Sequence, residues 1–376
     1  MEVLEFMNTH SDWEDILTQP PYSIKVKRDG DYILLKYNQL SSDFSLPIVR
    51  ECRGSIFYLN QHGRYECVCR AFDKFGNYGE SYVPEIDWDN AVVEEKVDGS
   101  LMKVWYHNNQ WHVSTNGTID AYKAEVDDAG LTFGDLFDEA ILLDKHKFFG
   151  GLNPNSVHMF ELVSPKSRAT ISYPHTELYY LGSRDMHTMK EYKVYDSELM
   201  WMYGVHYPKI FPLHTIEDCL SYVKTMTKDE EGFVIRDTHF NRIKLKSPEY
   251  LLAFHLNNNG AITTKRIISM MKDEMVDDFL AYCPEYKDRV QEVIDTISNI
   301  AQQMDTKWNE YHKIHWDNRR AFAAAVQKEQ YKDFLFVKLN NPKLRGIDYI
   351  MNRPTKQIRN MIKRSNGDGH KLLFDD

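Results

Sequence analysis

The feature that most constrains the fold of this chain is a change of hydrophobic pattern near residue 250. Before that point, apolar and polar residues alternate in short runs separated by turn signals, most clearly at Asp29-Gly30 between runs 23–28 and 32–37. Three further pairs of runs flank turns in the same way: 54–60 with 65–70, 101–106 with 111–114, and 231–236 with 242–245. After residue 250 the alternation stops and apolar residues recur at helical spacing.

This pattern predicts an α+β domain of antiparallel sheets and helices over residues 1–250, followed by an all-helical domain over residues 251–376. Within the first domain, helical spacing is present at 121–147 and 216–225. The predicted helices of the second domain cover residues 263–280, 286–303, 316–335 and 355–363. A length of 376 residues agrees with two or three domains.

Composition favours a globular protein of a reducing compartment. Hydrophobic residues make up 42% of the chain, which is enough for a sizeable core. No apolar run approaches the roughly 18 residues of a membrane span, and the acidic first residues do not resemble a signal peptide. The 5 cysteines are scattered, so we expect no disulfide framework and a cytoplasmic location.

Charge is distributed unevenly along a chain whose net charge is −10. The negative excess lies in residues 1–250, whereas residues 251–376 carry a small positive excess. Near the C-terminus, only Asp348 opposes a group of basic residues: Lys343, Arg345, Arg353, Lys356, Arg359, Lys363 and Arg364. Such a stretch can contact phosphates, and it can equally be a solvated helix face.

The sharpest local feature is Lys96-Val97-Asp98-Gly99, which follows the β-branched run that starts at Val92. It places one primary amine at the end of a predicted strand, beside a glycine that lets a ligand approach the backbone. A lysine in such a place can attack a phosphorus or carbonyl centre when it is neutral. The structural alternative is a hairpin turn with a surface lysine.

Four further segments follow this lysine in a fixed order. They are Met-Phe-Glu-Leu-Val at 159–163, Leu-Tyr-Tyr-Leu at 178–181, Glu-Glu-Gly-Phe-Val-Ile at 230–235 and Lys-Leu-Lys at 244–246. The series resembles the motifs of covalent nucleotidyltransferases, which include ATP-dependent DNA and RNA ligases and mRNA capping enzymes. Each segment is common by itself, so the specificity of the resemblance lies in the order and the gaps.

Within that superfamily the chain most resembles the RNA ligase 1 family of T-even-type bacteriophages. Upstream of the lysine, Tyr37-Asn38, Glu51-Cys52-Arg53-Gly54 and Asp73-Lys74-Phe75 resemble segments of that family. The helical C-terminal region agrees as well. DNA ligases and capping enzymes instead continue with a β-barrel domain, and no series of hairpins follows Lys246.

The resemblance implies that Lys96 attacks the α-phosphorus of ATP and becomes a lysyl-AMP. It implies a divalent metal, Mg²⁺ with Mn²⁺ as a substitute, held by the carboxylates of Glu231 and Glu161, of which Glu161 can instead accept from the ribose 2′-OH. Asp277 is a further implied metal ligand, and it can equally belong to a solvated helix face. The residues that it implies for binding the nucleotide are Tyr37, Arg53, Lys74, Glu95, Gly99, Glu161, Tyr179, Glu231, Lys244 and Lys246.

Several of these residues have structural alternatives. Lys244 and Lys246 alternate onto one face of a strand, as two ligands of one phosphate require, but lysines also guard exposed sheet edges. Tyr179 or its neighbour Tyr180 can stack on adenine or pack in the core. Asn116 departs from the family pattern, because it stands before Gly117 where the family has a basic residue.

The function implied by the resemblance is an ATP-dependent RNA ligase that joins RNA 3′-OH and 5′-phosphate ends during RNA repair in phage infection. The expected partner is RNA, either single-stranded or a tRNA cleaved in its anticodon loop, and the expected state is a monomer without membrane contact. Two alternatives remain open: a related enzyme that acts on DNA ends or nicked duplexes, and a non-catalytic RNA-binding relative.

Overall fold

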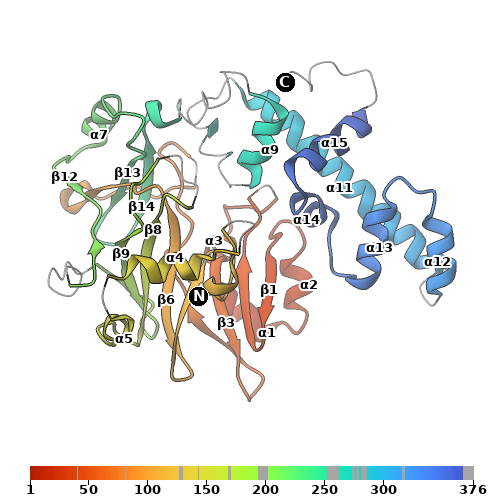
Figure 1. Cartoon of the computed structure of the whole chain (residues 1–376), viewed down its shortest axis with the longest axis horizontal. Coiled ribbons are helices and arrows are strands. Elements are labelled where there is room, and N and C mark those ends of the chain that lie inside the picture. Colours follow the sequence, from red (N-terminus) through yellow and green to blue (C-terminus); the bar gives the residue numbers. More distant parts are fainter. Residues whose placement is uncertain are drawn as a thin grey trace. The chain divides into compact units, whose positions relative to one another are not determined.

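The computed structural model describes residues 1–39, 41–80, 82–126, 130–142, 144–167, 171–193, 202–251, 262–272, 276, 279–280, 286–315 and 318–366. The chain divides into two compact units, Met1–Phe254 and His255–Asp376 (Figure 1). Sheets lie in the first unit and helices make up the described part of the second. No helix among the described residues is long and apolar enough to cross a membrane.

The described strands of the first unit form three sheets. The first sheet has the order β1 (Lys25–Asp29), β2 (Tyr32–Lys36), β3 (Arg53–Leu59) and β4 (Tyr65–Cys69). The second has the order β10 (Glu191–Tyr192), β9 (Glu177–Asp185), β8 (Ser156–Val163), β6 (Ser100–His107) and β7 (Gln110–Thr115), with β11 (Val205–His206) added to β9. The third has the order β12 (Ile210–Phe211), β5 (Val92–Glu95), β13 (Gly232–Arg236) and β14 (Arg242–Lys246).

The described helices of the first unit are short. They are α1 (Glu2–Thr9), α2 (Trp13–Leu17), α3 (Pro47–Glu51), α4 (Phe133–Ala140), α5 (Lys145–Gly150) and α7 (Ile216–Val223), with single 3₁₀ turns η1 (Trp88–Asn90) and η2 (Ala121–Lys123). Each helix covers a sheet face and shares a hydrophobic core with it: α1–α3 with the first sheet, α4 and α5 with the second, and α7 with the third.

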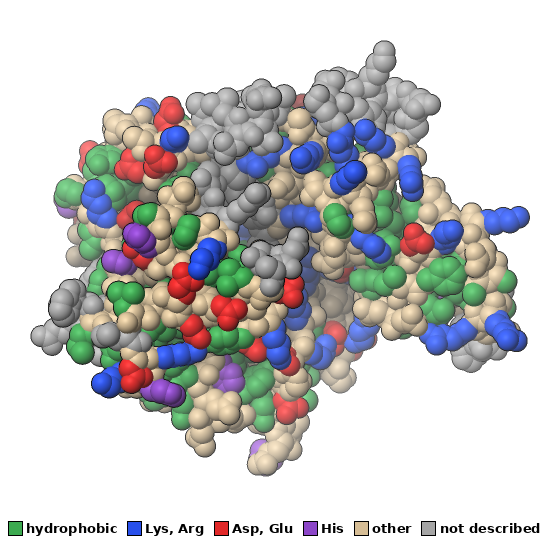
Figure 2. Space-filling model, viewed as in Figure 1, with side chains coloured by type: hydrophobic (Ala, Val, Ile, Leu, Met, Phe, Trp, Pro, Cys, Tyr) green, Lys and Arg blue, Asp and Glu red, His purple; other side chains and the backbone are tan. Residues whose placement is uncertain are grey.

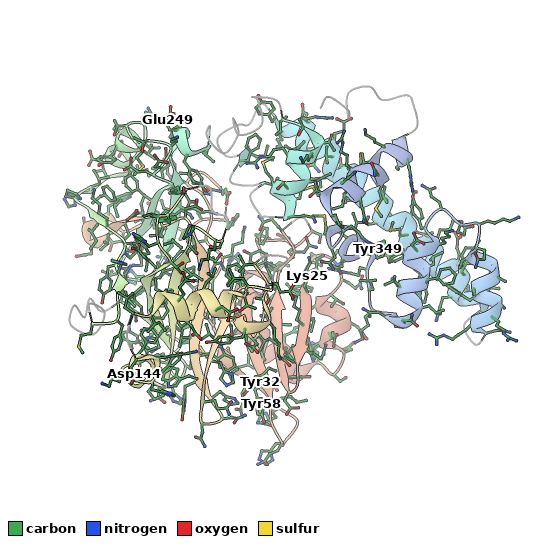
Figure 3. All side chains as sticks on the ribbon, viewed as in Figure 1. Lys25, Tyr32, Tyr58, Asp144, Glu249 and Tyr349 are labelled. Atoms are coloured by element: carbon green, nitrogen blue, oxygen red, sulfur yellow. The ribbon has the colours of Figure 1, made fainter. Side chains whose placement is uncertain are left out.

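The first two sheets pack on each other. Leu34 and Ile56 of the first sheet share a core with Trp105 and Val157 of the second. Because side chains alternate along a strand, the neighbours of these residues point to the opposite faces, where the helices pack. At one end, Tyr32 and Tyr58 lie side by side on β2 and β3 with ring centroids 5.3 Å apart (Figure 3).

All four predicted hairpins are confirmed. The pairs β1–β2, β3–β4, β6–β7 and β13–β14 are antiparallel and adjacent. The turn at Asp29-Gly30 has Gly30 at φ +58°, the left-handed conformation that this turn signal favours. One strand pair departs from the predicted antiparallel arrangement, because β11 runs parallel to β9.

The predicted helix over residues 121–147 is wrong. Its first turn is η2, and farther along the chain the Val126 N–H donates to the Leu131 carbonyl at 2.7 Å. Thr132 caps α4 and Asp144 caps α5. Both are typical N-cap residues, so the local capping signals outweigh the helical spacing of the apolar residues.

The described helices of the second unit are α9 (Thr264–Lys272), α11 (Lys287–His315), α12 (Arg319–Val326), α13 (Lys332–Asn340), α14 (Gly346–Met351) and α15 (Thr355–Asn366). α11 buries a stripe at helical spacing that includes Val293, Ile297, Ile300 and Met304, and the other helices pack around it. The predicted helix 286–303 is thus longer in the structure, and the predicted helix 316–335 is interrupted between α12 and α13.

Candidate active site

Lys96 lies immediately after β5, in the third sheet. Its backbone N–H donates to the carbonyl of Gly232 at 2.9 Å, which continues the pairing between β5 and β13. Its side-chain Nζ donates to Oε2 of Glu231 at 2.7 Å. Both contacts come from the start of β13, so the backbone pairing places the amine beside the carboxylate.

Glu231 joins two lysines. Its second oxygen, Oε1, lies 2.8 Å from Nζ of Lys246 on β14. The side chains of Glu231 and Lys246 are 2% and 3% exposed, whereas that of Lys96 is 21% exposed. Burial by itself raises the pKa of Glu231, but the charges of Lys246 and Lys96 outweigh it and hold that pKa below its ordinary value. Lys96 is therefore the most exposed member of the trio.

Two further carboxyl groups lie close to this trio. Burial and the Glu231 carboxylate raise the pKa of Asp98, although its Oδ2 accepts from the N–H of Ile171 at 2.8 Å. Burial raises the pKa of Glu161 to about 7, with Lys96 acting in the opposite direction. Glu161 therefore changes its charge near neutral pH, whereas the lowered pKa of Glu231 keeps that carboxylate charged.

Gly99 brings β6 against β8. A Cβ atom at this position would lie 2.4 Å from the carbonyl oxygen of Leu162 and 3.0 Å from Cγ of Glu161. Any larger residue would have to displace the β8 backbone. The structure therefore gives the glycine a packing role, and it places Gly99 directly beside Glu161.

The two tyrosines of β9 lie on opposite faces. Tyr179 is paired with Glu161 in the strand register and is half-buried, with its ring 5.3 Å from that of His206. Burial raises the pKa of Tyr179 to about 12. Tyr180 is part of the core that packs against α4. Of the two alternatives, Tyr179 is the tyrosine on the Glu161 face.

Arg53 also reaches this region, because its charge lowers the pKa of Glu161. Its guanidinium lies 4.6 Å from the ring centroid of Phe72. Nη1 of Arg53 and Oδ1 of Asn116 are both buried without a hydrogen-bond partner among the described residues. Buried polar atoms are normally satisfied, so such atoms mark a place where a bound ligand can supply the partner.

Tyr37 and Lys74 lie together. Nζ of Lys74 is 5.3 Å from the ring centroid of Tyr37 and 4.0 Å from that of Phe44. Lys74 also lines a cavity of about 280 Å³ whose other charged side chains are those of Arg50, Asp73, Glu191 and Arg242. These contacts show a basic, aromatic cluster, and they do not by themselves join it to Lys96.

The remaining predicted site residues are placed as follows. Oε2 of Glu95 accepts from the backbone N–H of Lys209 at 3.3 Å, at the edge of the third sheet. The backbone of Lys244 pairs with the segment at Gly76, and its side chain is half-buried. Asp277 lies outside the described residues.

A divalent metal fits this site only if the substrate supplies further ligands. Among the described residues, no cluster of three or more His, Cys, Asp or Glu side chains could hold a metal ion. Both oxygens of Glu231 already accept from lysines. Mg²⁺ is usually held by one or two carboxylates together with substrate phosphates and water. Glu161 and Glu231 can provide these carboxylates.

Sequence reasoning missed two contributors to the site. Asp98 enters the sequence prediction only as part of the motif at 96–99, yet its position two residues after Lys96 could have identified it. Tyr173 accepts the backbone N–H of Asp98 at 3.1 Å through its hydroxyl, and burial raises its pKa. No sequence pattern signals Tyr173, because it comes from a loop and is far from Asp98 along the chain.

Comparisons with known proteins agree with one another. Residues 51–250, which make up more than half of the chain, match a family model described as RNA ligase. A protein of Autographa californica nuclear polyhedrosis virus, described as a bifunctional polynucleotide kinase/RNA ligase, is 32% identical over 302 residues. That match covers 75% of this chain but 42% of the relative, so the chain spans less than half of that protein.

Two further proteins are similar over most of the chain. An RNA ligase of Rhodothermus phage RM378 is 23% identical over 386 residues and is matched over 87% of its length, with 84% of this chain covered. Among solved structures, an archaeal ATP-dependent RNA ligase is 16% identical, with a TM-score of 0.44 and 78% of each chain covered.

Proposed function

Because the chain belongs to the RNA ligase family, we propose that it is an ATP-dependent enzyme that joins RNA 3′-OH and 5′-phosphate ends through a lysyl-AMP intermediate. The observation that carries this proposal is the trio of Lys96, Glu231 and Lys246. It presents one partly accessible primary amine at a strand end, beside a buried lysine, within the segment that matches the family.

In the first step, the neutral amine of Lys96 attacks the α-phosphorus of ATP. A nitrogen–phosphorus bond forms, the bond to the β-phosphate oxygen breaks, and pyrophosphate leaves. Lys96 must first lose a proton, and its hydrogen bond to Glu231 must break. Lys246 brings a second positive charge to the place where negative charge develops on the phosphate, and such preorganised charge stabilises a transition state.

In the second step, the 5′-phosphate of RNA attacks the AMP phosphorus and the bond to Lys96 breaks, which regenerates the amine. In the third step, an RNA 3′-OH attacks the activated 5′-phosphate and AMP leaves. The protein mainly positions the reacting groups and supplies charge, because phosphoryl transfer needs little further covalent help. Arg53 and Tyr179, on the Glu161 side of the site, are proposed to hold the nucleotide.

The proposed metal is Mg²⁺, with Mn²⁺ as a substitute. Glu161 and Glu231 would hold it together with the phosphates of the nucleotide, and Asp277 is a further proposed ligand. The ion would neutralise phosphate charge. Since burial raises the pKa of Glu161 to about 7, this carboxylate binds a cation more readily as pH rises through neutrality.

The proposed substrate is RNA with unpaired ends, such as a tRNA broken in its anticodon loop. The helical unit supports this proposal, because α15 carries Lys356, Arg359, Lys363 and Arg364 and no acidic residue. Such a helix provides sequence-independent contacts to phosphates. We also propose that the protein acts as a monomer in RNA repair in an infected host cell.

A joining assay tests the proposal. The wild type should seal single-stranded RNA that bears a 5′-phosphate and a 3′-OH in preference to DNA ends or nicked duplexes. Lys96→Ala should fail with ordinary RNA but should still seal RNA that already carries 5′-adenylate, because only the first two steps need the lysine. Sealing of DNA or nicked duplex in preference to RNA would favour the alternative substrate class, and no joining of any substrate would contradict the proposal.

A further inference from the structure

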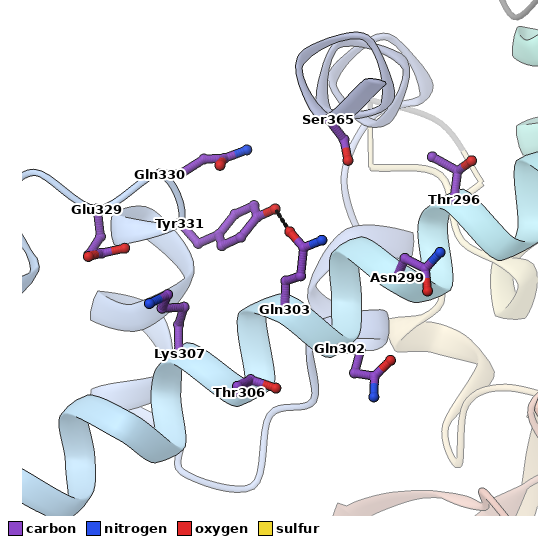
Figure 4. Close-up of a pocket in the computed structure, with 10 residues that line it drawn as sticks. All are labelled: Thr296, Asn299, Gln302, Gln303, Thr306, Lys307, Glu329, Gln330, Tyr331 and Ser365. Atoms are coloured by element: carbon purple, nitrogen blue, oxygen red, sulfur yellow. Dashed lines mark hydrogen bonds between the residues drawn. The ribbon is translucent and has the colours of Figure 1, made fainter. Parts of the chain in front are cut away.

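The helical unit contains a cavity of about 520 Å³ (Figure 4). One wall is α11, the second is the turn that contains Gln330 and Tyr331 before α13, and the third is the end of α15 at Ser365. Its volume lies within the range of roughly 300–1,000 Å³ that is typical of small-ligand pockets. The cavity lies in the second unit, apart from the residues of the proposed ligase chemistry.

The lining of this cavity is rich in carboxamides. Asn299, Gln302 and Gln303 come from α11, and Gln330 comes from the turn. From residue 296 to 304, α11 carries no charged side chain, although charged residues are frequent before and after that stretch. An ordinary solvated helix face is charged, and a core face is apolar. This part of α11 is neither, which indicates a surface for neutral polar ligands.

Tyr331 supplies an aromatic ring to the same cavity. Its hydroxyl donates to Oε1 of Gln303 at 2.6 Å, and this bond is drawn in Figure 4. The bond orients both side chains, so that the amide nitrogen of Gln303 presents its two N–H donors. A ring beside carboxamides matches a nucleobase, which has a π-face for stacking and donors and acceptors along its edges.

The charged side chains in the lining of the cavity are one lysine, Lys307, and one glutamate, Glu329. Ser365 belongs to α15, whose four basic residues are not opposed by any acidic residue of that helix. Figure 2 shows Lys and Arg side chains on the same unit. The carboxylate in the lining, Glu329, accepts from the hydroxyl of Tyr311 at 2.6 Å, and Lys307 lies 2.9 Å from Glu310. The basic residues that precede Ser365 on α15 can contact the backbone of a nucleic acid.

We propose that this cavity binds an unpaired nucleobase of the RNA substrate, with carboxamides on the base edge and Tyr331 against its face. The inference rests on the proposed RNA ligase function, which it extends by naming a recognition site for unpaired RNA in the helical unit. A paired base cannot enter such a cavity, so the site selects RNA with a loop or a free end.

The test uses the full chain and an RNA hairpin with 2-aminopurine in its loop, together with a duplex that holds the same base paired. Binding is followed by fluorescence of the base and by anisotropy. The double variant Asn299→Leu/Gln303→Met should bind the hairpin loop about tenfold more weakly, because bidentate base contacts contribute this order of discrimination. Its binding to the duplex should change by less than about twofold.

The matched control is Gln291→Met, which removes a carboxamide from the same helix outside the cavity, where it donates to Asp295. It should bind both RNAs like the wild type. Equal hairpin binding by the double variant and the wild type would overturn the inference and leave the cavity as a solvated helix face. Labelling of Lys96 by ATP, measured on the same preparations, separates the two claims: if labelling is intact, a failed hairpin result counts against the cavity alone.

Discussion

Glu231 is the residue on which the geometry of Lys96 depends, because one buried carboxylate holds two lysines at 2.7 and 2.8 Å. Removing its charge would leave Lys246, 3% exposed, without that counter-charge. A buried charge without a counter-charge strongly lowers the stability of a protein, whereas an intact buried ion pair stabilises it less than its Coulomb energy suggests. The carboxylate thus serves both the stability of the third sheet and the position of the nucleophile.

Glu231→Gln should lower the free energy of unfolding at pH 7 by about 2–4 kcal/mol. The pKa of Glu231 is lowered in the folded protein, so its contribution is present above its ordinary value of 4.5 and is lost as pH falls through the folded-state pKa. Urea unfolding of both proteins should therefore give a difference that shrinks below about pH 4.5. Asp229→Asn, a change at an exposed neighbour, is the control. A difference that persists unchanged in acid would contradict this account.

His158 should make the first unit sensitive to acid. Burial lowers its pKa to about 4, and its Nε2 donates to the carbonyl of Asn153 at 3.1 Å. The unfolded chain takes up a proton near pH 6.5 and the folded chain does not, so stability should fall as pH drops from about 6.5 towards 4. The free energy of unfolding should drop between pH 7 and pH 4.5 in both the wild type and His158→Gln. The drop should be about 2 kcal/mol smaller in His158→Gln, because the variant lacks the buried imidazole. Equal losses in His158→Gln and in the exposed control His187→Gln would rule out this role.

At the residue scale, the sequence could predict which residue types meet but not how they pair. Lys96, Glu231 and Lys246 were expected in one site, yet the sharing of one carboxylate by two lysines depends on the register of β5, β13 and β14. Asp98 enters the sequence prediction only as part of the motif at 96–99. Its raised pKa arises from burial and from the Glu231 carboxylate, and no local pattern in the sequence reveals either cause.

At the scale of elements, close packing between β6 and β8 positions Glu161. Gly99→Ala would place a methyl group 2.4 Å from the Leu162 carbonyl, and backbone cannot yield as a flexible side chain can. We expect a loss of about 1–3 kcal/mol in unfolding free energy, as for other overpacked sites. We also expect at least about tenfold slower self-adenylylation, because misplacement by an ångström is costly in catalysis.

Gly150→Ala, where nothing lies within 4 Å, should change neither property. Normal labelling of Gly99→Ala would show that this packing does not position the site.

Hairpins were predictable because their turn dipeptides and alternation are local signals. The helix predicted over 121–147 was wrong for a local reason too, since Thr132 and Asp144 begin separate helices. The stacking of the first two sheets was not predictable in this way. It depends on which face of β6 meets β2 and β3, and strand alternation alone does not choose that partner.

At the scale of the whole molecule, the division into two units suggests separable tasks. The described hydrophobic clusters that involve the three sheets all lie within residues 1–254. A fragment of residues 1–254 should therefore fold, as judged by circular dichroism, and should still be labelled by ATP. Its joining of RNA should be weaker by at least about tenfold, because it lacks the phosphate contacts proposed for α15. A folded fragment that is not labelled would contradict this division of tasks.

The most direct test of the central claim is covalent labelling of Lys96. Wild-type protein, first treated with pyrophosphate to remove any bound AMP, is incubated with Mg²⁺ and ATP labelled at the α-phosphate, then denatured and digested. We expect label on the peptide that contains Lys96, none in Lys96→Ala, and normal labelling in Lys228→Ala, a change at an exposed lysine of the same unit. Labelling of Lys96→Ala equal to that of the wild type, or no label on folded wild-type protein, would contradict the lysyl-AMP mechanism.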